Sequence, residues 1–360
     1  MAAEAGDLST IRSAVSATLA RFIDTQRSVL ASIGPDLTPC ADAITDLLAG
    51  GKRLRAAFCY WGWRACGGED NPAIFTAAAS LELLHASALV HDDVMDASDT
   101  RRGQPAVHRR FGSAHAAASW QGSADRFGAG AAILVGDLLL AWTDEMLRTS
   151  GLAAESVWRG LAVLDTMRTE VFAGQFLDLV GQASADTSVA NALRVVTYKS
   201  ARYTVERPMQ LGVALHGGRA PADRTAISAA FTGYGIPLGT AFQLRDDILG
   251  VFGDPAATGK PVNDDLREGK RTVMLAIAAE RASKAQLDLL RRCIGDPALT
   301  TETAEQVREV LTSTGAVAEC ELMISTHVKE ALAAIDAAPI TEASRTALAD
   351  LAIAATERTD

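Results

Sequence analysis

Apolar residues recur three to four positions apart through most of this 360-residue chain, and this spacing excludes most fold classes. Near the N-terminus, Ile11, Val15, Leu19 and Phe22 follow it, so they lie on one face of a predicted α-helix. The same period recurs in stretches that we expect to form further long helices: 72–96, 155–171, 188–216, 225–252 and 272–281. Alternation at period two, which is typical of strands, is scarce. The sequence therefore predicts an all-α fold.

Glycine and proline indicate where these helices should be interrupted. We expect a kink at Pro208, because proline lacks the amide hydrogen that a helix interior needs. Loops are expected at glycine-containing ranges: 67–68, 99–103, 112–128, 217–218 and 253–269. We find no linker that would divide the chain and no internal repeat. The prediction is a single domain over residues 1–360, with residues 1–8 flexible.

The charge balance excludes one large class of function. The chain has 34 Lys and Arg against 44 Asp and Glu, a net charge of −10. General nucleic-acid binders depend on basic surface, so we expect no nucleic-acid partner. We also expect no transmembrane segment, because no apolar run reaches the roughly 20 residues of a membrane span. The best candidate, 129–142, is interrupted by Asp137.

The N-terminus and the cysteines indicate the compartment. The first ten residues are acidic and are not followed by the basic and apolar regions of a signal peptide, so none is expected. The five cysteines are scattered and form no CxxC pair: Cys40, Cys59, Cys66, Cys293 and Cys320. They are typical of reduced core residues, and we expect a cytoplasmic protein.

A first cluster of acids follows an apolar helical stretch. Asp92 and Asp96 lie four residues apart and Asp93 lies between them, so a helix would bring the three carboxylates to one face. Carboxylates that repel one another at the end of a buried helix need a cation, and hard oxygen ligands suit Mg²⁺ bound together with phosphate. Arg101 and Arg102 follow and could neutralise such a phosphate.

A second cluster repeats this pattern. Asp246 and Asp247 end another apolar stretch, and the basic glycine-containing segments 259–261 and 269–272 follow. Two acidic helix ends, each followed by basic residues, indicate two halves of one diphosphate–Mg²⁺ site. A further basic run, GGKRLR at 50–55, is a weak signal alone and lacks the spacing of a nucleotide-binding P-loop.

Together these motifs resemble the trans-isoprenyl diphosphate synthases, the polyprenyl synthetase family. The resemblance rests on five motifs in order along the chain: GGKRLR at 50–55, HDDVMD and RRG within 91–103, GQFLD at 174–178, YKS at 198–200, and FQLRDD, GKP and GKRT within 242–272. The overall pattern is similar to actinobacterial geranylgeranyl diphosphate synthases. The resemblance implies a helical bundle around a central cavity, of the isoprenoid synthase type, and a homodimer.

The resemblance also implies roles for individual residues. Direct Mg²⁺ ligands would be Asp92, Asp96 and Asp246, with Asp93 and Asp247 as ligands or their neighbours. Isopentenyl diphosphate would bind Lys52, Arg55, His85 and Arg102. The allylic diphosphate would bind Arg101, Lys199, Ser200, Gln243, Lys260 and Lys270. Gln175 and Asp178 would line the same cavity mouth. The cofactor would be Mg²⁺, about three ions per active site, or Mn²⁺ in its place.

The chain departs from the family pattern at two positions. The second motif usually ends in aspartate but ends here in Gly250, which leaves fewer carboxylates on that side. Position 200 is serine where threonine is common, which keeps the hydroxyl.

Product length depends on small residues ahead of the first motif. Family members that stop at C15 close this level with an aromatic residue, whereas Ser87 and Ala88 leave it open. Leu84, about one turn before these residues on the helix, could then limit the length of the product. We therefore expect geranylgeranyl diphosphate (C20), with C25 or longer and C15 products as alternatives.

In the expected reaction, an allylic diphosphate ionises and isopentenyl diphosphate attacks the resulting cation head-to-tail. Two other functions fit part of the sequence. A class I terpene cyclase shares the first acidic motif, but it carries a different second motif and does not consume isopentenyl diphosphate. A non-catalytic subunit of a heteromeric synthase would be inactive when purified alone, and such subunits typically lose the acidic motifs.

Overall fold

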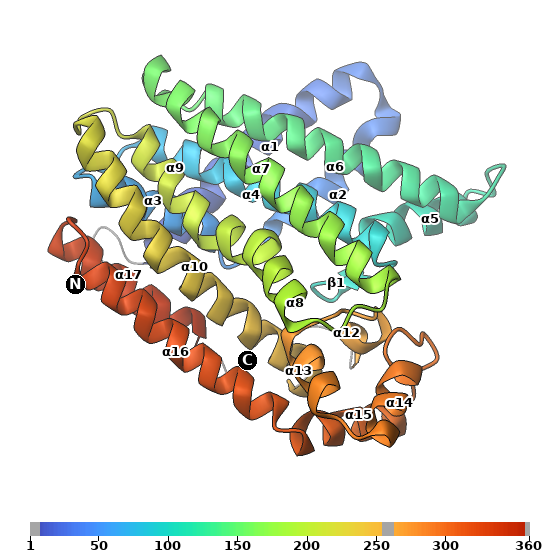
Figure 1. Cartoon of the computed structure of the whole chain (residues 1–360). Helices are drawn as coiled ribbons and strands as arrows, with labels where there is room; N and C mark the ends of the chain where they lie inside the picture. Colours follow the sequence, from blue (N-terminus) through green and yellow to red (C-terminus); the bar gives the residue numbers. More distant parts are fainter. Residues whose placement is uncertain (1–7, 254–262, 357–360) are drawn as a thin grey trace. The chain divides into compact units, whose positions relative to one another are not determined.

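The computed structural model describes residues 8–253 and 263–356, and its contacts divide the chain into two compact units. Unit 1 comprises Met1–Val163 and Pro208–Arg224, and unit 2 comprises Leu164–Arg207 and Thr225–Asp360. The all-α prediction is confirmed: within the described ranges the only strands are β1 (Thr100–Arg101) and β2 (Gln104–Pro105), which form one antiparallel pair. Figure 1 shows the elements in chain order.

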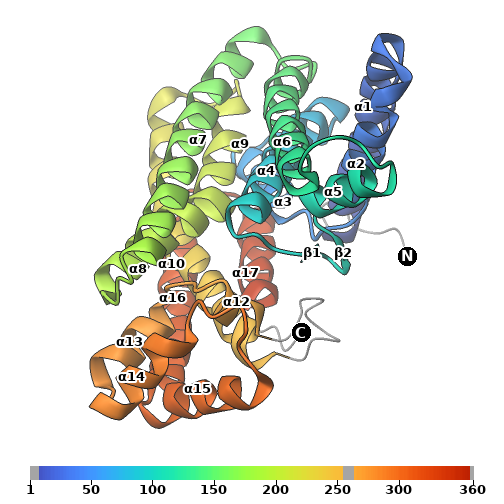
Figure 2. The same ribbon diagram turned by 90° about the vertical axis from the view of Figure 1, so that its right-hand side faces the viewer.

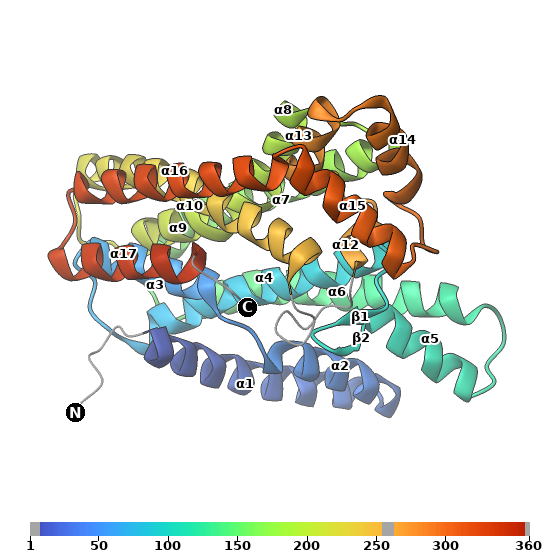
Figure 3. The same ribbon diagram turned by 90° about the horizontal axis from the view of Figure 1, so that it is seen from below.

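Unit 1 contains the N-terminal helices. Their bounds are α1 Leu8–Ile33, η1 Pro35–Leu37, α2 Thr38–Ala49, α3 Leu54–Ala65, α4 Pro72–Met95, α5 Val107–Ala117, α6 Ala124–Arg148, the first part of α7 (Ala154–Ala183), α9 from its second residue (Arg207–Leu215) and the start of α10 (Pro221–Phe252). Figure 3 shows α1 and α2 running side by side.

Helix α4 forms the core of unit 1. It begins at Pro72 after the cap residue Asn71, whose side chain accepts a hydrogen bond from the amide of Ile74 at 3.1 Å. Its apolar residues pack against α1, α3 and α6. By length and composition α4 and α6 could each cross a membrane, but core helices pass the same test, and 67% of the apolar window of α4 is buried. This packing fixes which residues of α4 reach the unit's surface at its acidic end.

The predicted loop over 112–128 is wrong, because most of this range is helical. Helix α5 continues to Ala117 and α6 begins at Ala124. A Cβ atom on Gly128 would lie 2.2 Å from the carbonyl oxygen of His108, so glycine allows α5 and α6 to approach closely here. Gly128 therefore serves helix packing, whereas Gly122, with φ 95°, lies in the short turn between the two helices.

Unit 2 contains the C-terminal helices. Their bounds are the rest of α7, α8 Val189–Val195, η2 Val196–Glu206, most of α10, α12 Asp264–Arg267, α13 Val273–Arg281, α14 Lys284–Cys293, α15 Thr301–Ser313, α16 Ala316–Asp336 and α17 Glu342–Thr356. Figure 2 shows α13, α14 and α15 grouped together. Helix α13 is buried over most of its length and packs against α15 and α16 in one apolar core.

The break expected at Pro208 takes the form of a π-helix that precedes it. The eleven residues of η2 end where the amide of Arg207 donates to the carbonyl of Arg202, five residues earlier. Pro208 has no amide hydrogen to continue the α-helical pattern, which favours this wider winding. Gly174 of α7 lets η2 approach, since a Cβ there would lie 2.4 Å from the backbone nitrogen of Lys199. The π-helix thereby holds Lys199 and Ser200 against α7.

Candidate active site

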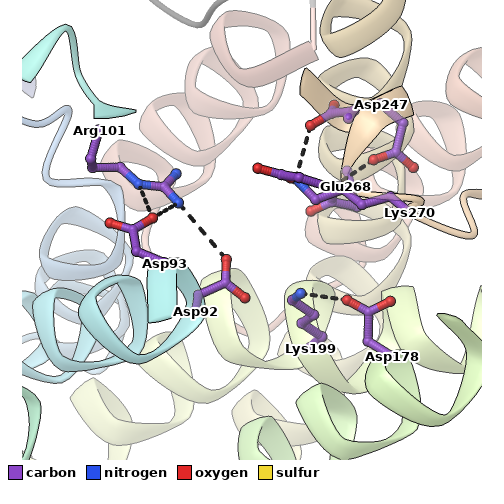
Figure 4. A network of polar contacts seen from close by, with 10 residues as sticks. Asp92, Asp93, Arg101, Asp178, Lys199, Asp247, Glu268 and Lys270 are labelled. Carbon is purple, nitrogen blue, oxygen red and sulfur yellow. Dashed lines mark hydrogen bonds and ion pairs between the residues drawn. The ribbon is translucent and has the colours of Figure 1, made fainter. Parts of the chain in front are cut away.

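The first acidic cluster lies at the C-terminal end of α4, in unit 1. Helix α4 ends at Met95, and the amide of the cap residue Asp96 donates to the carbonyl of Asp92 at 2.8 Å. Asp93 is buried, at 2% exposure, and Arg101 donates to its Oδ1, from Nε at 2.9 Å and also from Nη2 (Figure 4). The same guanidinium lies 4.0 Å from Oδ2 of Asp92. In this structure Arg101, expected at the allylic diphosphate, therefore neutralises the acids of α4.

The basic segment 50–55 of unit 1 is held in place by a buried ion pair. Arg53, the residue before α3, has a left-handed backbone with φ 54°. Its guanidinium lies 3.4 Å from the carboxylate of Glu82 on α4 and also donates to the carbonyl of Leu48 and the hydroxyl of Ser16. Arg53 thus links α1, α2 and α4 at the start of α3. The motifs of the sequence assign no role to Arg53; the one signal for its ion pair is the acidic Glu82 inside an apolar helix.

The charges of four arginines act on His85, which lies about two turns ahead of Asp92 on α4. Arg102 crosses to the segment before α3, where it donates to the carbonyls of Leu47 at 3.1 Å and Gly50 at 2.9 Å. Burial, reinforced by Arg55, Arg102, Arg101 and Arg53, lowers the pKa of His85 well below its ordinary value. The positive charges of Arg55 and Arg102 therefore both disfavour the protonated form of His85.

Lys52 and His91 lie at the edges of this region. Lys52 is exposed and precedes Arg53. Nε2 of His91 lies 3.2 Å from the carbonyl oxygen of Ile133 and 3.6 Å from a carboxylate oxygen of Asp137, both on α6. Gly136 leaves room for this ring, because a Cβ there would lie 2.1 Å from Nε2. His91 therefore packs α4 against α6.

The predicted allylic-site residues of unit 2 form two linked sets. Lys199 of η2 donates to Asp178 of α7 at 2.6 Å (Figure 4). The hydroxyl of Ser200 donates to Gln243 at 2.6 Å, and the amide of Gln243 donates to Asp247 at 2.8 Å. Serine in place of threonine at position 200 thus keeps a hydroxyl that orients Gln243.

Gln175 is half-buried and lies three residues ahead of Asp178 on α7. Lys260 lies outside the described residues. The other predicted allylic-site residues of unit 2 each contact an acid or an amide side chain of that unit: Lys199, Ser200, Gln243 and Lys270.

The second acidic cluster lies near the end of α10. Asp247 is buried, at 8% exposure, and burial raises its pKa to about 7. The negative charges of Asp246 and Asp265 add to this rise, while Gln243 and Lys270 oppose it. Lys270 lies 2.8 Å from Asp265 and 2.6 Å from Glu268. A divalent cation beside Asp247 would favour the charged form of this carboxyl.

The acidic side chains of the two clusters suit Mg²⁺ that is bound partly by substrate better than a metal that is bound only by protein ligands. Within residues 8–253 and 263–356, no three His, Cys, Asp or Glu side chains converge closely enough to hold a metal by themselves. Mg²⁺ commonly takes one or two carboxylates and completes its shell with water and substrate phosphate. Each acidic helix end offers such carboxylates beside basic side chains, so the residues present fit Mg²⁺ bound together with a diphosphate.

The residues expected to limit product length differ in burial. Ser87 and Leu84 of α4 are completely buried, whereas Ala88 is partly exposed. The side chain of Ser87 therefore points into the core of unit 1, and Ala88 is the small residue of this pair that is open to a neighbouring space.

Comparison with known proteins identifies the family. The polyprenyl synthetase model matches residues 38–312. A crystal structure of geranylgeranyl pyrophosphate synthase from Corynebacterium glutamicum, complexed with isoprenyl diphosphate and magnesium, has a TM-score of 0.93 and 41% identity, covering 98% of this chain and 99% of that one. Geranylfarnesyl diphosphate synthase of Aeropyrum pernix is 31% identical over 89% of this chain and 93% of its own length. Geranylgeranyl diphosphate synthase of Mycobacterium tuberculosis is 33% identical over 82% and 77%. An all-helical chain with two acidic helix ends and their basic neighbours therefore belongs to the polyprenyl synthetase family, as a trans-prenyl diphosphate synthase.

Proposed function

We propose that this synthase condenses isopentenyl diphosphate with dimethylallyl, geranyl or farnesyl diphosphate and releases mainly geranylgeranyl diphosphate. The observation that carries the proposal is the pairing of each acidic helix end with its own basic set: Asp92 and Asp93 with Arg101 in unit 1, and Asp247 with Lys270 near it in unit 2. The relative with 41% identity is a geranylgeranyl synthase, which supports the C20 product.

The proposed metal ligands are Asp92, Asp96 and Asp246, each on an acidic helix end. When bound, Mg²⁺ would supply electrostatic stabilisation of the pyrophosphate that leaves the allylic substrate. Asp93 and Asp247 lie beside these ligands. Arg101 and Gln243, respectively, hold their carboxylates in position. The magnesium of the Corynebacterium structure supports this cofactor.

Two basic sets would bind the two diphosphates. In unit 1, Lys52, Arg55, His85 and Arg102 would bind isopentenyl diphosphate, and the low pKa of His85 makes its ring a neutral hydrogen-bonding partner among arginines. In unit 2, Lys199, Ser200, Gln243 and Lys270 would hold the allylic diphosphate. Gln175 and Asp178 would lie at the same mouth, where Asp178 positions Lys199.

Carbon–carbon bond formation needs a dry site more than a dedicated base. The allylic cation would be attacked by the double bond of isopentenyl diphosphate, and water must be excluded so that it does not quench the cation. The buried apolar residues of α4 supply such a wall. The proton would leave to the released pyrophosphate.

Product length would be set at Ala88. The partly exposed Ala88 leaves space for the growing chain one turn from Asp92, whereas the buried Ser87 supports the helix from inside unit 1. Leu84, also buried, would lie behind this level. The geranylfarnesyl synthase among the relatives makes C25 the main alternative product.

We also propose a homodimer in the cytoplasm. Helix α6 exposes Ile133 and Leu134, the latter at 69%, and apolar surface of this kind suits a subunit interface. The five cysteines are free thiols, which suits a reducing compartment.

One assay tests the function. The purified protein is incubated with Mg²⁺, radiolabelled isopentenyl diphosphate and each allylic primer, and the dephosphorylated products are separated by chain length. Incorporation of label into a C20 alcohol is the expected result. Cyclised product without incorporation would indicate a terpene cyclase, and no product from the protein alone would indicate a non-catalytic subunit.

A further inference from the structure

Three residues of α7, each one turn from the next, contact the π-helix η2 along one face. Glu170, Gly174 and Asp178 lie at intervals of four residues, so they share that face of α7. Gly174 admits the backbone of Lys199, and Asp178 accepts a hydrogen bond from the side chain of Lys199 at 2.6 Å. The motifs of the sequence and the proposed site leave Glu170, the first residue of this row, without a role.

Glu170 binds two arginines of the segment that carries Lys199. Its Oε1 accepts hydrogen bonds from Nη1 of Arg202 at 2.9 Å and from Nη2 of Arg207 at 2.6 Å. Its Oε2 accepts one from Nε of Arg207 at 2.7 Å. The side chain of Glu170 is 16% exposed, and its hydrogen bond raises the pKa of Arg207, as expected for a charge-assisted contact. Glu170 therefore links η2 to the first residue of α9.

The spacing of the two arginines makes this contact specific for π-helical winding. Arg202 and Arg207 are five residues apart, and the amide of Arg207 donates to the carbonyl of Arg202. This bond, which is typical of a π-helix, places one arginine above the other. In an α-helix, with 3.6 residues per turn, residues five apart point about 140° away from each other, so the two guanidiniums would lie on different faces. Glu170 therefore favours the π-helix over an α-helix in this segment.

The winding of η2 determines the direction of Lys199 and Ser200. Both residues belong to η2, and a change to α-helical winding would turn them about the helix axis relative to α9. On the side of α10, the hydroxyl of Thr232 donates to Glu206 at 2.7 Å. Contacts with two helices thus hold η2, and the contact with Glu170 is the one that depends on the five-residue spacing.

We propose that Glu170 is a positioning residue: by binding Arg202 and Arg207, it selects the π-helical winding that directs Lys199 and Ser200 at the allylic diphosphate. This inference rests on the proposed function, which assigns Lys199 and Ser200 to that substrate. It adds a residue that acts on the reaction only through η2.

Steady-state kinetics of Glu170→Gln test the proposal, because this change keeps the shape of the side chain and removes its charge. We expect the KM for the allylic substrate to rise about 3- to 10-fold, equivalent to one weakened hydrogen bond, and the KM for isopentenyl diphosphate to stay unchanged. Glu319→Gln is the matched control, since it breaks another ion pair of unit 2, with Arg281 at 3.0 Å, which joins α13 to α16. It should leave both KM values as in the wild type.

Two further measurements separate positioning from a general loss of stability. Because Glu170 acts through Lys199, Glu170→Gln should raise the allylic KM less in a Lys199→Ala background than in the wild type. Amide hydrogen exchange over residues 196–207 of the full chain should be faster in Glu170→Gln, and it requires no turnover.

An unchanged allylic KM in folded Glu170→Gln would overturn the proposal, as would an equal rise in both KM values, additive effects in the double variant, or wild-type exchange over 196–207. If Glu170→Gln does not fold, Arg202→Gln takes its place, with the same expected and contradicting results. Failure of the wild type to consume isopentenyl diphosphate would contradict the proposed function instead, and the exchange measurement would still report whether Glu170 holds η2.

Discussion

Replacing Arg53 with methionine removes the cation that neutralises Glu82 inside unit 1. Both side chains are 4% exposed or less, and the guanidinium lies 3.4 Å from the carboxylate. Arg53 also donates to Leu48 and Ser16, whereas methionine has a similar length and no donor. Glu82 would then retain its long contact with the amide of Ala56, at 3.4 Å, and the more distant charge of Arg102.

The cost follows from the burial of the pair. Removing one partner of a buried ion pair lowers the free energy of unfolding by about 3–5 kcal/mol, because the remaining charge is left uncompensated. For a domain of 150–250 residues, 1 kcal/mol corresponds to a shift of about 2–4 °C in Tm. We therefore expect the transition of unit 1 to fall by roughly 6–20 °C. Since Arg53 lies between Lys52 and Arg55, the KM for isopentenyl diphosphate should rise as well.

Scanning calorimetry measures the shift, with Arg12→Met as a control because Arg12 is an exposed arginine of α1 in the same unit. The double variant Arg53→Met, Glu82→Leu removes both charges and should be more stable than Arg53→Met alone, since no buried charge remains. A Tm for Arg53→Met equal to that of the Arg12 control would refute the reasoning. A double variant less stable than the single one would show that the cost lies in packing and not in the stranded charge.

The remaining predictions concern the site. Asp92→Ala should lower kcat by about 10²–10³-fold or more, because it removes a group that acts on the departing pyrophosphate, and near-normal turnover would contradict its assignment as a ligand. Arg55→Ala should raise the KM for isopentenyl diphosphate by about 10- to 100-fold, and Lys199→Ala should raise the KM for the allylic substrate, because each variant loses one charge-assisted hydrogen bond. Equal effects of either variant on both substrates would show that the two sites are wrongly separated. Ala88→Phe should shorten the product to C15 in a chromatographic assay, and an unchanged product from an active variant would remove Ala88 as the limit. Folding lowers the pKa of His85, so below about pH 6.5 the unfolded chain binds more protons than the folded one. The wild type should therefore lose stability relative to His85→Gln as the pH falls through that value. A difference in Tm between the two proteins that stays constant from pH 8 to pH 5 would contradict this.

Local patterns were sufficient to predict the helices and the acidic helix ends. The apolar period over 72–96 and the proline that starts it agree with α4, which runs from Pro72 to Met95 and carries Asp92 and Asp93 at its end. Helical period and capping depend on residues within a few positions of one another, so they can be read from the chain directly. The spacing of the motifs likewise indicated which residue types would lie beside the acids.

The role of a glycine cannot be predicted from the sequence where it depends on a distant segment. Gly128 is needed because α5 passes within contact of it, and Gly250 because Asp265 occupies its side-chain space. A glycine that begins a turn and one that admits a neighbouring helix look the same in a single sequence.

Tertiary structure alone decided which charged residues are buried in ion pairs and which remain exposed. Within one basic run of six residues, Arg53 is buried against Glu82 while Lys52 remains exposed. Composition and spacing could not separate the two, because burial depends on where α1, α2 and α4 meet. The same holds for Asp265, which the sequence places 15 residues after Gly250 and the fold places in contact with it. The sequence thus determined the chemistry that was available, and the packing of helices distant along the chain decided where each charge could act, since contact between such residues exists only in the folded state.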